Sequence, residues 1–288
     1  MTASPIAADR FAVDEELAPP PPRKLRRPFK SRLLGIWAAL VYIWLFAPIV
    51  VIVLFSFNEP KGKFNIVWNQ FTLQNWLHPF RKAEYRDALI TSLQVAAVSV
   101  LIATIIGSMM ALALSRYDFK GKGFVNIVVV LPLTTPEIVM GSSLFTLFFA
   151  RNIGFGFTTV TLAHIMFCVS FVAMTVQART RGFDWTLEDA ALDLGSSPWR
   201  TFRTVTFPLI LPGIAAAALL SFALSIDDYI ITSFVAGDSI TTFPMRIFNA
   251  NKTELPPQIN VLATCILIFT LGLMGFGALY GARKQRTT

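Results

Sequence analysis

Six long apolar runs constrain this chain more than any other feature of its sequence. They cover residues of about 33–57, 88–114, 124–149, 159–178, 209–236 and 259–280. Each run has about 20 residues or more, which is the length that an α-helix needs to cross a bilayer. Over the whole chain 54% of the residues are apolar and only 15% are charged, as in membrane proteins. The sequence therefore predicts an all-α integral membrane protein with six transmembrane helices.

The two ends of the chain differ from this apolar middle. Residues 1–32 hold few apolar side chains and a run of prolines, so we expect a disordered basic arm on the cytoplasmic side. The apolar run that follows is too long for a cleaved signal peptide, and no small-residue cleavage site lies close behind a short core. The membrane domain is predicted to cover residues 33–283, and residues 284–288 are expected to form a cytoplasmic tail.

The basic residues predict the orientation of the helices. Six spans place both termini on one side of the membrane, and that side receives 17 of the 25 Lys and Arg residues. Because basic loops stay in the cytoplasm, we expect both termini and the loop at 179–207 to be cytoplasmic. The net charge of +8 follows from this topology. It does not indicate nucleic acid, because the aromatic residues lie in apolar runs and do not alternate with basic ones.

The polar interval at 186–212 separates two apolar runs and predicts two short helices. Thr186 and Asp189 have the spacing of a capping box, which begins a helix. Gly195 suits the left-handed residue that ends one. Ser197 followed by a proline is a second start, with a hydroxyl N-cap and proline at the first helical position.

One face of the first short helix is apolar. Its residues have the spacing i, i+3, i+4 and i+7, namely Leu187, Ala190, Ala191 and Leu194. The acidic residues Glu188, Asp189 and Asp193 are expected elsewhere on the helix surface. A helix this short needs a packing partner to be stable. From the pattern alone, that partner is either the chain's own bundle or another chain.

Small residues recur at four-residue spacing in two of the runs. The second run contains Gly107 and Ala111, and the fifth contains a row of four, namely Gly213, Ala217, Ser221 and Ser225. Such rows let two helices approach closely in a membrane. The fifth run is longer than one crossing needs, so we expect its helix to break near Asp227 and to continue as a short re-entrant or surface segment.

Acidic residues inside the apolar runs are candidates for function, namely Glu137, Asp227 and Asp228. A charge within the membrane is unfavourable unless it faces a cavity or a partner. No Lys or Arg in the spans neutralises these acids, which suits a cationic or strongly hydrogen-bonding ligand. Two alternatives stay open. Glu137 can accept backbone N–H groups that the neighbouring prolines free, and the two aspartates can be hydrated at a helix end. Asp228 is expected closer to the small-residue face than Asp227.

Other chemistries have less support from the residues. His164 stands alone in the fourth run, without a second ligand at metal-binding spacing, and we expect it to be a packing histidine. Cys168 and Cys265 lie in apolar runs and give no disulfide framework. The sequence has neither a Gly-x-x-x-x-Gly-Lys-Ser/Thr loop nor a nucleophile and base set with local context. If ATP drives the protein, another chain binds it.

The 186–212 interval resembles the EAA loop in the membrane subunits of bacterial ABC importers, whose pattern is Glu-Ala-Ala-x3-Gly-x9-Ile-x-Leu-Pro. The matching residues are Asp189-Ala190-Ala191, Gly195 and Val205-Thr206-Phe207-Pro208, with Asp, Val and Phe in place of Glu, Ile and Leu. The similarity covers roughly residues 33–283 and looks strongest to the second permease subunit of spermidine/putrescine importers. It includes Pro136-Glu137-Ile138-Val139 and Ser225-Ile226-Asp227-Asp228.

This resemblance implies a type I importer fold in which the loop forms a coupling helix that docks on a cytoplasmic ATPase. The residues expected at that contact are Glu188, Asp189, Ala190, Ala191, Gly195 and Pro208. It also implies a substrate path for polyamines, in which carboxylates meet amine groups and aromatic rings add cation–π contact. The residues expected along that path are Glu137, Ser225, Asp227, Asp228, Tyr229 and Trp68.

The resemblance further implies an assembly in the bacterial inner membrane. The partners would be a homologous second permease subunit, two cytoplasmic ATPase subunits and an extracytoplasmic polyamine-binding protein, within the lipid bilayer. ATP and Mg²⁺ would be bound by the ATPases, so this chain would hold no cofactor and catalyse no reaction. Two alternatives stay open: a self-sufficient proton-coupled cation carrier that uses the same acids, and an ABC permease for another small solute.

Overall fold

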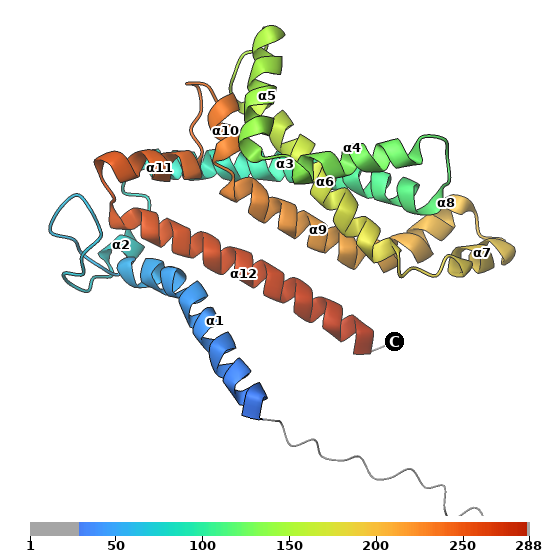
Figure 1. Cartoon of the computed structure of the whole chain (residues 1–288), viewed down its shortest axis with the longest axis horizontal. Coiled ribbons are helices and arrows are strands. Elements are labelled where there is room, and N and C mark those ends of the chain that lie inside the picture. The colour runs from blue at the N-terminus through green and yellow to red at the C-terminus, as the bar shows by residue number, and fades with distance from the viewer. Residues whose placement is uncertain (1–28, 287–288) are drawn as a thin grey trace, which may run out of the picture. The chain divides into compact units, whose positions relative to one another are not determined.

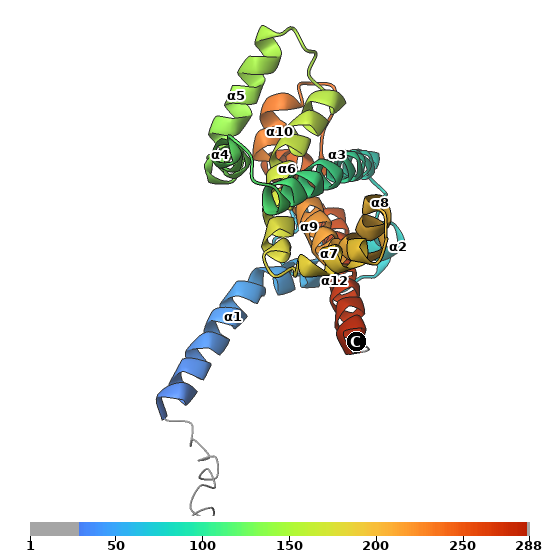
Figure 2. The ribbon, with the colours of Figure 1, turned by 90° about the vertical axis from the view of Figure 1, so that its right-hand side faces the viewer.

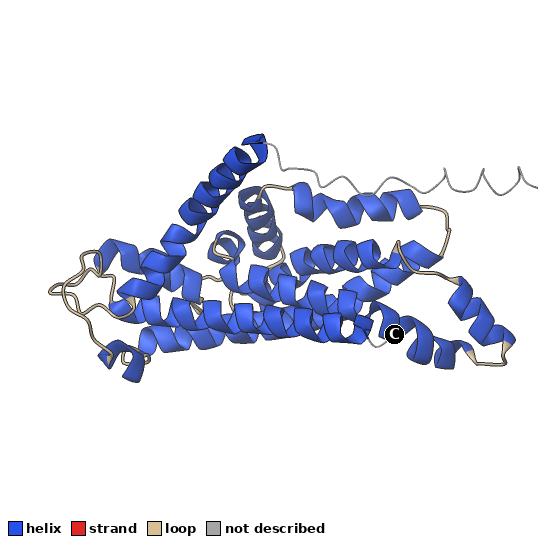
Figure 3. Ribbon diagram, turned by 90° about the horizontal axis from the view of Figure 1, so that it is seen from below, coloured by secondary structure: helices blue, strands red, loops and turns tan. Residues whose placement is uncertain are grey.

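The computed structural model describes the backbone of residues 29–286 and the side chains of residues 33–272. Nearly all regular structure in this part is helical, as Figure 1 and Figure 3 show, which confirms the predicted all-α class. The chain divides into two units, residues 1–50 and 51–288, which we describe separately. Residues 1–28 of the predicted N-terminal arm lie outside the described part.

Helix α1 (Phe29–Phe55) contains the first predicted span. It begins at Phe29, so the last residues of the predicted arm are already helical. The stretch Leu33–Phe55 has a mean hydropathy of 2.7 and is long enough to cross a bilayer.

Three long helices form the core of the second unit, namely α3 (Ala83–Arg116), α6 (Phe157–Thr180) and α9 (Phe207–Asp227). They pack against one another, and Figure 1 shows them side by side. The predicted small-residue rows lie at these contacts. A Cβ atom added to Gly107 would lie 2.7 Å from Cβ of Val172, and one added to Gly213 would lie 2.8 Å from Cβ of Arg179. The helices therefore meet through small residues, as predicted.

The third predicted span, 124–149, is not one continuous helix. It consists of α4 (Lys122–Thr134) and α5 (Glu137–Ala150), which are bent by 109° relative to each other. Thr135, between them, is extended with φ −79° and ψ 130°. The residue before a proline avoids the helical region, so Pro136 explains why the first helix stops at this point. In Figure 1, α5 turns away from the layer formed by α3, α6 and α9.

The fifth predicted span breaks where the sequence predicted a break. Helix α9 ends at Asp227, Asp228 is extended, and the short helix α10 (Ile230–Val235) follows. The buried residues of α10 pack with α5 and α6 in one apolar cluster, which includes Ile231, Val235, Met140, Leu144, Val160 and Phe167. This cluster holds α10 against the N-terminal half of α6.

The two ends of the second unit carry different short elements. At one end lie α7 (Thr186–Asp193) and α8 (Pro198–Thr201), and Figure 2 views the unit from that side. At the other end in Figure 1 lie α2 (Gln74–Leu77) and α11 (Phe243–Thr253). Ion pairs join α11 and the residue after it to the start of α3, between Arg246 and Glu84 and between Glu254 and Lys82.

By length and composition, four helices of the described part can each cross a membrane alone. A fifth crossing is possible if α4 and α5 together make one span. The sixth predicted span, 259–280, falls within α12 (Pro257–Arg286), whose described apolar stretch is Pro257–Gly272. Helix α12 reaches Arg286 and so includes most of the predicted tail. The chain is thus a multi-pass membrane protein.

Candidate functional site

The first short helix of the 186–212 interval begins at the predicted residue, but with a different cap. Asp184 accepts hydrogen bonds from the backbone N–H and the hydroxyl of Thr186, at 3.0 and 2.7 Å. The expected capping box of Thr186 and Asp189 is absent from the described contacts. The backbone N–H of Thr186, which Asp189 would accept in that box, is instead bonded to the carboxylate of Asp184. The same bonds lower the pKa of Asp184 below its ordinary value.

The turn between α7 and α8 has the predicted geometry. Gly195 has φ +82°, the left-handed conformation that ends a helix, and Ser196 N–H donates to the carbonyl of Ala191 at 3.1 Å. The hydroxyl of Ser197 accepts from Arg200 N–H at 3.4 Å, so the second N-cap is also confirmed. The interval is therefore two capped helices joined by a glycine turn.

The apolar face of this pair of helices points outward. Leu187, Leu194 and Trp199 are 47%, 89% and 71% exposed, so the described bundle does not cover them. Glu188 is instead the most buried residue of α7, at 2% exposure. Glu188 lies away from the apolar stripe, as expected, but it faces into the protein, where its carboxylate finds two polar partners. Its ion pair with Arg116 and its hydrogen bond from Thr206 hold α7 by a polar contact and leave its apolar stripe free.

The two adjacent aspartates have different environments. Asp228 has a side chain only 6% exposed, and its carboxylate accepts from the backbone N–H groups of Ile231 and Thr232, at 3.2 and 2.8 Å. The Thr232 hydroxyl donates to it as well, at 2.6 Å. Asp227, the last residue of α9, is exposed. Asp228 thus caps α10 from within the protein, whereas Asp227 is free to meet a ligand.

His164 is a packing histidine, as predicted, and it joins three helices. It is 1% exposed, with Nδ1 2.8 Å from the hydroxyl oxygen of Ser225 and Nε2 2.9 Å from that of Thr232. Ser225 and Asp228, both predicted for the path, are therefore gathered around this ring. Sequence reasoning did not place His164 in the cluster, although a lone ionisable residue in an apolar run was a signal for it.

An aromatic pair lies beside the exposed aspartate. The ring of Tyr229 stacks on that of Phe248, with centroids 4.5 Å apart, and Phe248 is 45% exposed. The ammonium of Lys252 lies 5.1 Å from the Phe248 ring centre, so this surface already accommodates one amine cation. Neither Phe248 nor Lys252 was predicted, because they lie on α11, far from Asp227 in the sequence.

The other two predicted path residues lie elsewhere. Glu137 is the first residue of α5, immediately after the bend, and its side chain is exposed. Trp68 belongs to the segment between α1 and α2, where its ring packs edge-on against Phe55 at 6.1 Å. The buried Asn58 holds this segment, because its amide donates to Asn65 and to the carbonyl of Val67, at 2.7 and 2.8 Å.

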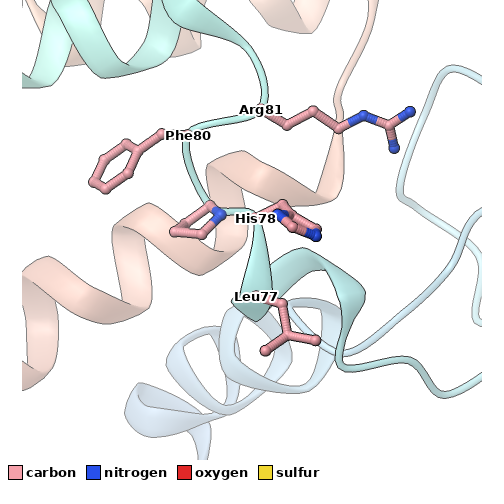
Figure 4. Close-up of a pocket in the computed structure, with 5 residues that line it drawn as sticks. Leu77, His78, Phe80 and Arg81 are labelled. Carbon is pink, nitrogen blue, oxygen red and sulfur yellow. The ribbon is translucent and has the colours of Figure 1, made fainter.

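An open pocket of about 600 Å³ lies at the link between α2 and α3. Figure 4 shows its lining, which consists of Leu77, His78, Pro79, Phe80 and Arg81. The lining has no carboxylate and contains the guanidinium of Arg81. A basic pocket repels cations, so it is not a site for the amine ligand that the acids suggest.

Comparisons with known proteins agree with the fold. Residues 103–287 match the family described as binding-protein-dependent transport system inner membrane component. The spermidine/putrescine transport system permease protein PotC of Escherichia coli (strain K12) is 38% identical over 84% of this chain and 91% of its own length. The putrescine transport system permease protein PotI of the same strain is 37% identical, over 86% and 90%.

A solved structure shows the same fold at lower sequence identity. It is a bacterial alginate ABC transporter in complex with a periplasmic protein bound to an alginate pentasaccharide. The match has a TM-score of 0.60 and 14% identity, and it covers 86% of this chain and 93% of that chain. The chain belongs to the family of inner membrane components of binding-protein-dependent transport systems. It is thus an ABC transporter permease subunit, a transport component with the type I fold.

Proposed function

We propose that this chain is a permease subunit of an ATP-driven importer for polyamines such as spermidine and putrescine. The observation that carries the proposal is the outward apolar face of the 186–212 loop, which Glu188 holds in place from inside. Its relatives are named for spermidine and putrescine transport, which supports the choice of cargo. The assembly would contain a homologous second permease subunit, two cytoplasmic ATPases and an extracytoplasmic polyamine-binding protein, in the bacterial inner membrane with both termini of this chain cytoplasmic.

In this assembly the coupling loop supplies the contact for an ATPase. Leu187, Leu194 and Trp199 form an exposed apolar surface next to a glycine turn, which suits insertion into a cleft of another protein. ATP and Mg²⁺ are bound by the ATPase subunits and not by this chain. The loop therefore converts closure of the ATPases into movement of the helices.

The surface near the end of α9 suits a chain of amines. The exposed carboxylate of Asp227 can pair with one ammonium group, and the Tyr229–Phe248 pair can accept another through its π face. Lys252 occupies that face in the structure, so an incoming amine would have to displace its ammonium. Glu137 and Trp68 remain predicted path residues.

The test is uptake by the reconstituted complex. The chain is co-purified from its native membrane with its partners, placed in proteoliposomes, and supplied with ATP inside and labelled spermidine or putrescine outside with the binding protein. We expect uptake that requires hydrolysable ATP and that excess unlabelled polyamine reduces. ATP-dependent uptake of a different solute, with no polyamine uptake, would refute the cargo.

The same preparation separates the proposal from a self-sufficient carrier. A proton-coupled carrier would move the cation through proteoliposomes that contain this chain alone, driven by a pH gradient and without ATP. We expect no uptake by proteoliposomes that contain this chain alone, because the apolar stripe of the loop would have no ATPase to contact. Uptake without the other subunits would overturn the importer assignment.

A further inference from the structure

One buried carboxylate ties the coupling loop to the helix bundle. Glu188 is 2% exposed, and its two carboxylate oxygens have different partners: the guanidinium of Arg116 pairs with one, and the hydroxyl of Thr206 donates to the other. Its neighbour Asp189 is exposed. Two successive acids of the loop therefore have opposite positions, one inside the protein and one outside.

This polar contact, more than apolar packing, orients α7. The helix has eight residues, which is too short to be stable alone. Of its leucines, Leu187 is exposed and Leu192 is half-buried, and Leu194 at the C-cap is exposed. The guanidinium of Arg116 also lies over the ring of Trp185, 5.8 Å from its centre, just before the helix begins. Because a buried carboxylate is unfavourable without its partners, the angle of α7 depends on Arg116 and Thr206.

The partners of Glu188 belong to the elements that cross the membrane. Arg116 is the last residue of α3. Thr206 is the last residue of a π-helical turn, Phe202–Thr206, which leads directly into α9. Such turns are often found at functional positions. The hydroxyls of Ser115 and Thr180, 2.6 Å apart, join the ends of α3 and α6 next to this point. Displacement of Glu188 would thus act on three core helices together.

Helix α3 extends from this point to the opposite end of the unit (Figure 1). Its 34 residues make a rod of about 50 Å at the usual rise per residue. In this part of α3, the Ser92 hydroxyl accepts a hydrogen bond from the backbone N–H of Phe243 at 2.8 Å. Glu84, also on α3, pairs with Arg246. Phe243 and Arg246 both belong to α11. Helix α11 carries Phe248, which stacks on Tyr229. A continuous set of contacts therefore connects the loop with the candidate amine site.

We propose that Glu188 is a positioning residue that transmits displacement of the coupling loop to α3 and α9, while the outer face of the loop contacts the ATPase. The inference rests on the proposed function, because it requires an ATPase that moves the loop. Glu188 acts only through Arg116 and Thr206. Glu188 is buried, whereas Asp189, Leu187 and Leu194 are exposed.

A double-mutant cycle distinguishes transmission from mere stability. The variants are Arg116→Met, Glu188→Gln and both together, each reconstituted with its partner subunits. Arg116→Met leaves a buried carboxylate unpaired and should lower the yield of assembled complex, whereas the double variant removes both charges and should restore it. If Glu188 transmits movement, the restored double variant will still take up about two- to tenfold less polyamine per ATP hydrolysed.

Normal uptake per ATP in the assembled double variant would overturn the inference, since Glu188 would then be only a structural residue. Thr206→Val is the second variant, because it removes the other bond to Glu188 and leaves the ion pair intact; we expect a lower uptake per ATP with it as well. Asp118→Asn is the matched control. It breaks an exposed ion pair with Lys122, 2.8 Å long, beside the same end of α3, and should leave coupling unchanged.

A cargo-independent measurement keeps this test separate from that of the proposed function. Spin labels are attached at Asp193→Cys on α7 and Lys120→Cys next to α3, in a background without the two native cysteines. With Glu188 intact, the distribution of distances between the two labels should stay narrow both without and with ATP. In the double variant the distribution should broaden when ATP is added. Equal distributions would overturn the inference even if polyamines were not the cargo.

Discussion

Nε2 of His164 and the Oδ2 atom of Asp228 lie 3.3 Å apart, across the contact between α6 and the break that separates α9 from α10. Thr232 bonds to both residues, and Ser225 bonds to the second ring nitrogen. Four polar side chains from three helices therefore satisfy one another within an apolar cluster. A network of this kind fixes one geometry, because each member left unpaired would be unfavourable.

Replacement of His164 by Phe is expected to destabilise the protein. Ser225 would lose its buried partner, at a cost of about 1–3 kcal/mol, whereas Thr232 would keep its hydrogen bond to Asp228. The measurement is the melting temperature in detergent of the purified chain. Gln at the same position is the matched control, because its amide can bond to part of the same network; it should melt between the wild type and the Phe variant. Equal melting of all three would contradict a structural role for the ring.

Asp227→Asn and Asp228→Asn should have different effects. Asp227 is exposed, so its loss should leave the melting temperature unchanged and reduce polyamine uptake by roughly tenfold, the value of one charge-assisted hydrogen bond. Asp228 caps α10, so its loss should lower the melting temperature and impair uptake through folding. Uptake and melting are measured on the same preparations. Normal uptake by the Asp227 variant would remove this residue from the path.

Gly195→Val should uncouple ATP hydrolysis from transport. A β-branched residue at φ +82° is strained by about 1–2 kcal/mol, and no atom lies near enough to prevent insertion of the side chain, so only the turn should change. The six predicted spans should insert normally, and uptake per ATP should fall. Gly182→Val, at another loop glycine without close neighbours, is the control and should couple normally.

Leu194→Ser should weaken docking of the ATPase. Leu194 is 89% exposed within the chain, so its replacement cannot disturb the described core, yet it should cost about 1–2 kcal/mol of binding if it is buried in a partner. Co-purification of the ATPase and its apparent affinity are the measurements. Leu101→Ser, at a residue of α3 that is 64% exposed and away from the loop, should leave the affinity unchanged.

Gly107→Val should separate α3 from α6. An added Cβ would approach Val172 to 2.7 Å, so the helices would have to move apart, at a cost of about 1–3 kcal/mol. Gly123→Ala provides the control, since nothing lies within 4 Å of an added Cβ there. The two variants are compared by thermal melting in detergent. A Gly107 variant as stable as the control would contradict close packing at this position.

Much of the fold followed from local patterns. Apolar length predicted the helices α1, α3, α6 and α9 within a few residues, because a membrane helix must satisfy its own backbone and needs about 20 apolar residues to do so. The four-residue spacing of Gly213, Ala217 and Ser221 predicted which face of α9 is buried. Gly195 and Ser197 predicted the turn of the coupling loop for the same local reason.

Position within the bundle did not follow from such patterns. The amphipathic stripe of α7 left open whether Leu187 packs on this chain's own bundle or on another chain, and it did not predict that Glu188 is buried. The burial of Glu188 depends on Arg116 and Thr206, which belong to other elements of the fold. Which of the two adjacent aspartates is buried depends in the same way on His164 and Thr232, which both contact Asp228. The bend between α4 and α5 shows the same limit, since the sequence is apolar on both sides of it. Hydropathy and spacing specify helices and faces, whereas the partner of a buried charge depends on which helices meet in space.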